Sequence, residues 1–81
     1  MILLYFAWVR QKVGKSEEQI TAEASDVAQL IAHLRSLGPN YADAFADLSR
    51  IRVAVNQRHT GLDAKIGPND EVAFFPPVTG G

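Results

Sequence analysis

The chain opens on a run of residues that is apolar on both alternating faces. Residues 2–9, ILLYFAWV, contain no charged or polar residue other than tyrosine and tryptophan. Aromatic and β-branched residues favour strands, and a run without polar positions is typical of a strand covered on both sides. We therefore predict a strand over residues 2–9 and a turn or loop over residues 10–15. A second, more polar strand is expected over residues 17–24, at an edge of the sheet.

The next segment has the period of a helix. Apolar residues recur there every three or four positions, as on one helical face, at Val27, Leu30, Ile31, Leu34 and Leu37. Ser25 is the expected N-cap, with Asp26 in the first turn, where its charge suits the helix dipole. Gly38 and the proline after it are expected to end the helix. A short second helix, capped by Asn40, should carry on one side Tyr41, Ala44, Phe45 and Leu48.

Two shorter patterns follow the helices. Residues 51–55 alternate isoleucine and valine with polar or small residues, which predicts a half-buried strand. Residues 61–70 are rich in turn-forming residues. Within this second segment we expect a short strand anchored by Leu62 and Ile66.

The last strand is predicted over residues 71–75, with Val72 and Phe74 on one face and Phe75 on the other. It ends at Pro76, because proline cannot donate a ladder hydrogen bond. The helix should pack on one sheet face, against Leu3, Tyr5, Val53, Val55, Val72 and Phe74. The first and last strands are apolar on both faces, so a second face must be covered by the short helix and loops or left for a partner. The pattern alone leaves both possibilities open.

Composition and charge narrow the class of protein. The 81 residues suffice for one domain with a modest core. Eight basic and nine acidic residues give a net charge of -1, so a nucleic-acid partner is not expected. Arg50, Arg52 and Arg58 form the nearest approach to a basic cluster, as a solvated face or as a contact for an acidic partner.

The chain also lacks the residues of several kinds of site. It has no cysteine and only two distant histidines, so no disulfide, thiol nucleophile or metal site is expected. The first apolar run is too short to cross a bilayer, and no cleavage site follows it. We therefore expect a cytoplasmic protein that does not act at a membrane.

The distinctive chemical feature is the ending PPVTGG. Pro76 and Pro77 favour extended backbone, which directs the following residues away from the domain. Four more residues reach roughly 13 Å, at about 3.3 Å per residue. Glycine has no Cβ, so the last two residues fit a channel too narrow for others. We predict a domain of residues 1–77 and a flexible tail that carries its carboxylate into another protein's active site, formed by Val78, Thr79, Gly80 and Gly81.

The ending also resembles that of a known family. DEVAFFPPVTGG, residues 70–81, is similar to the C-terminus of the small subunits of molybdopterin synthase, which are sulfur carriers. YFAWVR (residues 5–10) and VAVNQ (residues 53–57) resemble the first and central strands of that family. The resemblance implies an α+β, ubiquitin-like β-grasp fold, in which one long helix packs on a mixed sheet and the first and last strands are central, parallel neighbours. RHTGLD, residues 58–63, is more polar than the family's partner-facing region.

The resemblance implies a reaction cycle as well. A ubiquitin-activating-type enzyme would use ATP to adenylate the Gly81 carboxylate, and a sulfur donor protein would displace AMP to leave a thiocarboxylate. The tail would then enter the large subunit of the synthase, within a heterotetramer. There its sulfur would pass to cyclic pyranopterin monophosphate and build the dithiolene of molybdopterin. This chain would be a non-catalytic sulfur donor that binds no cofactor or metal itself, while the large subunit supplies the catalytic groups.

Docking residues are expected on the sheet face opposite the helix. Phe75 is the first candidate because it leads directly into the tail, and Pro76 and Pro77, which follow it, are expected to contact the partner as well. Phe6 and Leu4 follow by strand alternation. Three other functions remain open: a sulfur carrier for thiamine thiazole synthesis, a modifier that joins its C-terminus to lysines of target proteins, and a plain interaction module.

Overall fold

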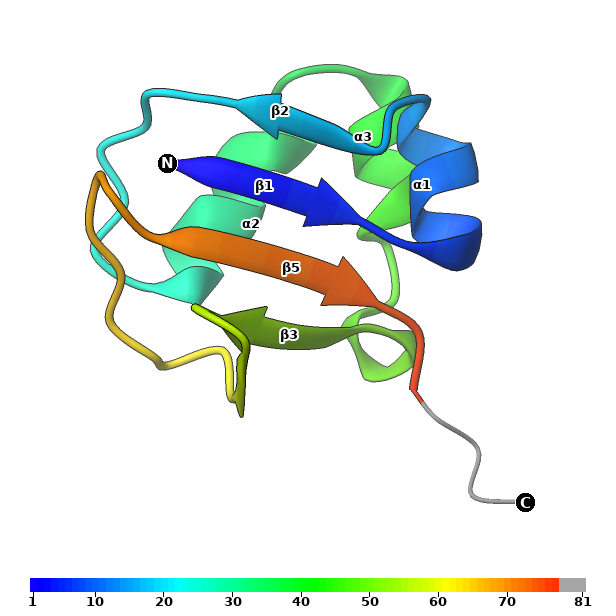
Figure 1. Cartoon of the computed structure of the whole chain (residues 1–81). Coiled ribbons are helices and arrows are strands. Elements are labelled where there is room, and N and C mark those ends of the chain that lie inside the picture. The colour runs from blue at the N-terminus through cyan, green and yellow to red at the C-terminus, as the bar shows by residue number, and fades with distance from the viewer. Residues whose placement is uncertain (78–81) are drawn as a thin grey trace.

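The computed structural model describes residues 1–77, which form one five-stranded mixed sheet and its helices. Strand order is β2-β1-β5-β3-β4, with β1 and β5 parallel at the centre and the other neighbours antiparallel. The expected β-grasp arrangement, with central parallel first and last strands, is confirmed (Figure 1). Along the chain the elements are β1 (Ile2–Tyr5), α1 (Ala7–Val13), β2 (Glu17–Gln19), α2 (Val27–Arg35), α3 (Pro39–Ala44), the 3-10 helix η1 (Leu48–Arg50), β3 (Arg52–Val55), β4 (Arg58–Thr60) and β5 (Glu71–Phe75).

The helices lie on one side of the sheet. α2 crosses behind the strands in Figure 1, and α3 packs between α2 and α1. The side of the sheet that faces the viewer carries no helix within residues 1–77. The short helices therefore do not cover the second apolar face. None of the helices in this part of the chain is long and apolar enough to cross a membrane.

The core forms between α2 and the covered sheet face. The four buried residues of α2, Val27, Leu30, Ile31 and Leu34, are at most 1% exposed, and they share one cluster with the inward side chains of the central strands. Phe74 is the centre of this cluster, stacked on Tyr5 at 6.1 Å and edge-on to Phe45 at 5.0 Å between ring centroids. The predicted packing face is confirmed for Leu3, Tyr5, Val53, Val72 and Phe74, while Val55 is half-buried at the cluster's margin.

The first predicted strand is too long. β1 ends at Tyr5, and α1 takes up the rest of the apolar run and most of the expected loop. Ala7 turns the chain with a left-handed backbone (φ 52°), after which Val9 and Val13 bury one side of a helix. Valines four residues apart fit a helix as well as alternation fits a strand, so the apolar pattern is ambiguous here. Gly14, in left-handed conformation at the helix end, was the available signal.

The long helix differs from its predicted ends. Asp26, not Ser25, is the N-cap, because its side chain accepts a hydrogen bond from the Gln29 amide at 2.8 Å. Ser25 lies outside the helix and hydrogen-bonds the Gln29 side chain. The helix ends at Arg35, so Leu37 leaves the apolar stripe and is 46% exposed.

The second helix begins before its predicted cap. Pro39 occupies the first turn and Gly38 is the N-cap, so Asn40 is inside α3. The Asn40 side-chain amide donates to the Val13 carbonyl at 2.8 Å and ties α3 to the end of α1. Leu48, expected on the same helical side, lies in η1 and is half-buried.

Two edge strands also differ from expectation. β2 is at an edge as predicted, but it ends at Gln19 because its β1 partner there, Ile2, is the first residue of that strand. No strand forms at Leu62 or Ile66, and β4 lies instead over Arg58–Thr60. A two-residue hairpin turn, which the polar sequence RHT did not suggest, pairs it with β3.

Candidate functional site

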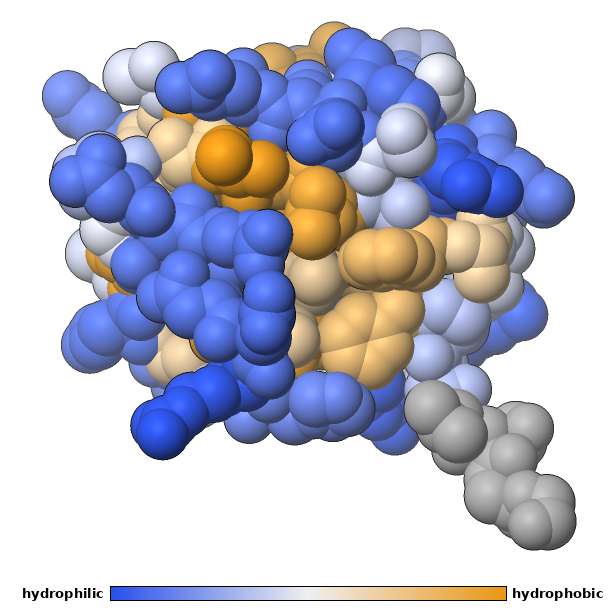
Figure 2. Space-filling view, viewed as in Figure 1, coloured by the Kyte–Doolittle hydropathy of each residue, from blue (hydrophilic) through white to orange (hydrophobic). Residues whose placement is uncertain are grey.

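The uncovered side of the sheet, here called the open face, carries an apolar centre between polar edges. Cross-strand partners point to the same side of a sheet, so the pairing registers assign its side chains. Figure 2 shows the apolar ones as a patch over the middle strands, bordered by hydrophilic residues. The registers place on the open face Glu17 and Gln19 (β2), Ile2 and Leu4 (β1), Glu71, Ala73 and Phe75 (β5), Arg52 and Ala54 (β3), and His59 (β4).

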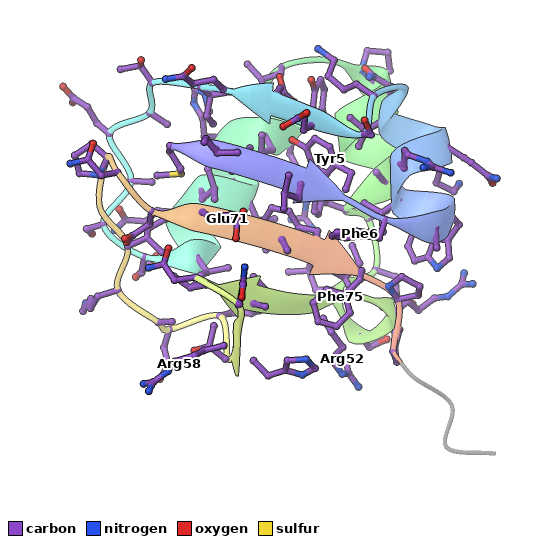
Figure 3. The ribbon with its side chains drawn as sticks, in the orientation of Figure 1. Tyr5, Phe6, Arg52, Arg58, Glu71 and Phe75 are labelled. Carbon is purple, nitrogen blue, oxygen red and sulfur yellow. The ribbon has the colours of Figure 1, made fainter. Side chains whose placement is uncertain are left out.

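Three predicted docking residues gather in this patch. Phe6 and Phe75 lie next to each other at the ends of the two central strands (Figure 3). The Phe6 amide donates to the Phe74 carbonyl at 3.1 Å, which extends the parallel ladder by one residue and sets Phe6 beside Phe75. Phe6 is 47% exposed, whereas Phe75 and Leu4 are half-buried. Large apolar side chains exposed together on one face are typical of a protein-binding surface.

Phe6 owes its position to the turn that follows it. It is the N-cap residue of α1, with an extended backbone and no side-chain capping bond. Its carbonyl accepts hydrogen bonds from the amides of Val9 at 3.1 Å and Arg10 at 3.3 Å, which begin the helix. The left-handed Ala7 between strand and helix costs about 1 kcal/mol. This turn lets the chain leave the sheet while Phe6 stays on the open face.

The root of the predicted tail adjoins the same patch. β5 ends at Phe75, and Pro76 and Pro77 follow it half-buried. Pro76 is also where the strand was predicted to stop, and the end of β5 is confirmed. The predicted tail residues lie outside the described part of the chain, so their roles stay predictions: Val78, Thr79, Gly80 and Gly81.

Basic side chains flank Phe75 on its other side. Arg52 is its direct cross-strand partner, and the His59 ring lies 5.1 Å from the Phe75 ring. Nearby, the Arg50 guanidinium lies 5.4 Å above the Trp8 ring, within the range of a cation–π contact. The sequence did not place His59 at this site, because β4 was not predicted. The sequence feature that indicates this hairpin is the alternation of apolar residues followed by a two-residue turn that begins with Asn56.

A second polar cluster lies on the helix side. The hydroxyls of Tyr5 and Tyr41 both donate to Glu18 Oε2 at 2.8 Å, and Lys15 lies 3.5 Å from Glu18 Oε1. Burial, reinforced by the Glu18 carboxylate, raises the pKa of Tyr5 far above its usual value, so this hydroxyl stays a donor. The cluster ties β1, β2 and α3 together. Residues 1–77 contain no set of three acidic or histidine side chains that could hold a metal ion.

Known proteins similar to this chain match it over nearly its full length. Residues 3–81 match the ThiS family. The molybdopterin synthase sulfur carrier subunit of Escherichia coli (strain K12) is 39% identical over 79 residues, which cover 98% of this chain and 96% of that protein. The protein of the same name from Haemophilus influenzae is 34% identical with the same coverage. These relatives confirm the resemblance noted in the C-terminal residues.

Solved structures agree with the fold. SAMP1 from Haloferax volcanii has a TM-score of 0.78 at 25% identity, covering 100% of this chain and 98% of its own. A putative molybdopterin converting factor subunit 1 from Pyrococcus furiosus has a TM-score of 0.74 at 30% identity and 95% coverage of both chains. The complex of subunits 1 and 2 of the Helicobacter pylori molybdopterin-converting factor contains a chain with a TM-score of 0.64 at 20% identity, covering 99% of this chain and 96% of its own. With its ubiquitin-like β-grasp fold and a match over residues 3–81, the chain belongs to the ThiS family.

Proposed function

We propose that this chain is the sulfur-carrier subunit of a molybdopterin synthase. The observation that carries the proposal is the continuity of the open apolar face, through Phe75, with the root of a Gly-Gly tail. Relatives that bear this name and match nearly the whole chain support it. The domain would dock on the partner, and the tail would deliver the sulfur.

The tail chemistry follows from the weakness of a carboxylate as an electrophile. Adenylation by a ubiquitin-activating-type enzyme, at the expense of ATP, converts the Gly81 carboxylate to a mixed anhydride with AMP. The terminal sulfur of a persulfide on the donor protein attacks the carbonyl carbon, the carbon–oxygen bond to the phosphate breaks, and AMP leaves with the electron pair. A thiol then attacks the inner sulfur of the resulting acyl disulfide, so that the S–S bond breaks, a new disulfide forms on the donor and the thiocarboxylate is released. The resulting thiocarboxylate donates its sulfur to cyclic pyranopterin monophosphate. Because this cycle consumes ATP, we place it in the cytoplasm.

The proposed partner is the large subunit of the synthase. Phe75, Phe6 and Leu4 would dock on an apolar surface of that subunit, and Pro76 and Pro77 would aim the tail into its active site. The Helicobacter pylori protein with this fold forms a complex of subunit 1 with subunit 2. Two sulfurs are needed for each dithiolene, so two carriers in a heterotetramer suit the reaction. The catalytic groups would belong to the large subunit.

Two measurements test the proposal. Intact-mass spectrometry of the chain from cells with an active pathway should show one oxygen-to-sulfur exchange at the C-terminus. Chemically prepared thiocarboxylate carrier and purified large subunit should form the pterin dithiolene. Deleting Gly81 moves the reactive carbon by roughly 3.3–3.6 Å. A shift of even about 1 Å can cost about 100-fold in a positioned reaction, so the deletion variant should form little dithiolene.

Variants of the tail separate its parts. Adding one residue after Gly81 should fail as the deletion does, because the reactive carboxyl then belongs to another residue. Gly80→Val should impair transfer by obstructing the channel, without loss of the fold. A normal product yield from the sulfur-loaded deletion variant would overturn the proposed mechanism.

A protein modifier is the second candidate function. The likeness to a small archaeal modifier protein, SAMP1, favours it. A modifier would form isopeptide-linked ladders on target proteins in cells, which a denaturing gel and peptide mass spectrometry would identify. A sulfur carrier for thiamine thiazole synthesis would also acquire a thiocarboxylate. Only the reconstitution with the large subunit and the pterin distinguishes that alternative.

A further inference from the structure

Arg52 lies where the open face meets Pro76 and Pro77, at the base of the predicted tail. It is the cross-strand partner of Phe75, so the two side chains project from the same face of the sheet. Figure 3 shows them beside each other at the end of β5. Arg52 is exposed, and Phe75 is half-buried. An aromatic anchor with an arginine at its side is a combination enriched at the centres of protein interfaces.

The guanidinium of Arg52 is held in place without a charged partner. Its Nη1 donates to the carbonyls of Ser49 at 3.2 Å and Ile51 at 3.1 Å. Within residues 1–77 no carboxylate lies within 4.0 Å of it, since the ion pairs there join Lys12 to Asp43 and Lys15 to Glu18. Arginine has five donors in a planar fork that fits a carboxylate bidentately. Because backbone carbonyls already hold Nη1 in place, the Arg52 side chain loses less conformational entropy when a carboxylate binds.

The charges of the open face are separated along its length. His59 pairs with Ala54 on the open face, level with Ala73 of β5, and its ring reaches back to the Phe75 ring. Glu71 lies four residues before Phe75 on the same strand face, roughly 13 Å away at about 3.3 Å per residue. Glu17 is on β2, at the far edge of the sheet. Arg52 and the His59 ring therefore border Phe75, and the acidic groups of the face lie elsewhere.

We propose that Arg52 pairs with a carboxylate of the docked large subunit, next to the apolar pocket that takes Phe75. This inference rests on the function proposed above and adds the chemistry of the partner surface. An apolar patch alone permits sliding and rotation of the two surfaces. One charge pair at the tail root fixes their register, and so directs the tail to the active-site entrance. It also selects a large subunit that has the matching Asp or Glu.

The test is binding of the full chain to its cognate large subunit, measured by calorimetry at low and moderate salt. Arg52→Glu should weaken affinity by about 10-fold or more at low salt, since it sets like charges against each other. Arg52→Leu, which keeps apolar contact, should lose less affinity than Arg52→Glu, and its affinity should depend less on salt than that of the wild type. Arg58→Glu is the matched control, because Arg58 is exposed but is the partner of Val55 on the opposite face. It makes the same change in net charge and should leave affinity within about 2-fold.

A charge-swap scan identifies the partner carboxylate. Each surface Asp or Glu of the large subunit is changed to Arg, and one such variant should weaken the wild-type carrier yet restore binding of Arg52→Glu. Equal effects of Arg52→Glu and Arg58→Glu, or a scan without any rescuing variant, would overturn the inference. If Phe75→Asp still abolishes binding in that case, only the role of Arg52 is rejected and the proposed function stands. If the wild-type chain and large subunit do not bind at all, the proposed function itself fails.

Discussion

At the residue scale, single left-handed positions control the turns of this small sheet. Asn56 and Gln57 have φ angles of 51° and 68° and connect β3 to β4. The Asn56 side chain fastens this turn to the start of β5, accepting from the Glu71 amide and donating to Asp70 Oδ1, each at 3.0 Å. Asparagine tolerates this backbone region, whereas glutamine is strained in it.

The strain at Gln57 gives the first prediction. Gln57→Gly should raise the free energy of unfolding by about 0.5–1 kcal/mol, because glycine adopts a positive φ without a Cβ clash. Urea denaturation measures the change. Gly14→Ala is a control that should change stability in the opposite direction. Gly14 has φ 95° with no atom within 4 Å of an added Cβ, so backbone strain alone should lower the free energy of unfolding of this variant by about 1 kcal/mol. A Gln57→Gly variant less stable than wild type would contradict this account.

Asp70 gives the chain a specific sensitivity to acid. Hydrogen bonds from the Asn56 side chain and the Gly67 amide lower the pKa of its carboxyl. The folded state therefore favours the charged form, and this stabilisation is present above the unfolded pKa of about 3.9 and is lost as pH falls through the lower folded value. The stability difference between wild type and Asp70→Asn should shrink as pH falls below about 4. Thermal unfolding across pH measures it, and a pH-independent difference would exclude this role.

At the element scale, β5 has two faces in different environments. Val72 and Phe74 are fully buried against the helices, whereas Ala73 and Phe75 lie on the open face. The same strand thus holds the core together and leads to the predicted docking residue. A strand must be apolar on both sides to do both, which is why its sequence has the composition of a fully buried strand.

This division predicts unequal effects of the same substitution at adjacent positions. Phe74→Ala should lower the free energy of unfolding by about 3–5 kcal/mol, because it removes a buried ring and leaves a cavity. Leu30→Ala, on α2, should lose about 2–5 kcal/mol for the same reason. Phe75→Ala is the matched control and should lose clearly less than Phe74→Ala, since its ring is partly in solvent. Chemical denaturation of the three variants would contradict the face assignment if Phe75→Ala were the most destabilised.

At the scale of the whole molecule, one-sided coverage of the sheet separates folding from docking. The three α-helices of residues 1–77 lie on one side, so the core is complete without the open face (Figure 1). The open face can therefore vary with the partner without threatening the fold. In the proposed function, its position next to Pro76 and Pro77 would link recognition of the large subunit to delivery of the C-terminus.

The separation predicts that docking can be lost while folding is kept. Phe75→Asp should weaken binding to the large subunit by about 2 kcal/mol or more, because it removes apolar contact and buries a charge in the interface. Leu37→Asp is the control: Leu37 is 46% exposed after α2, away from the open face, and should bind normally. Circular dichroism should show both variants folded. Unchanged affinity of Phe75→Asp for the large subunit would show that docking uses another surface.

The candidate site could be predicted where strand alternation determines it. Phe75 had to face away from Phe74, and Phe6 and Leu4 followed from the same period of two. The sequence identifies Arg52 only as part of a basic cluster, because its place beside Phe75 depends on the pairing of β3 with β5. His59 was missed because its strand is held by a hairpin turn without glycine.

By itself, the sequence determined the long helix, the core face of the last strand and the end of that strand at Pro76. Each depends on local periodicity or on residues whose chemistry does not need a partner, such as Pro76 and Pro77. Tertiary structure alone decided where β1 stops and α1 starts, since Val9 satisfies a strand and a helix equally until it packs. It also decided that one sheet face stays open and which charges border Phe75. Those features depend on contacts between segments far apart in the chain, and no local pattern encodes them.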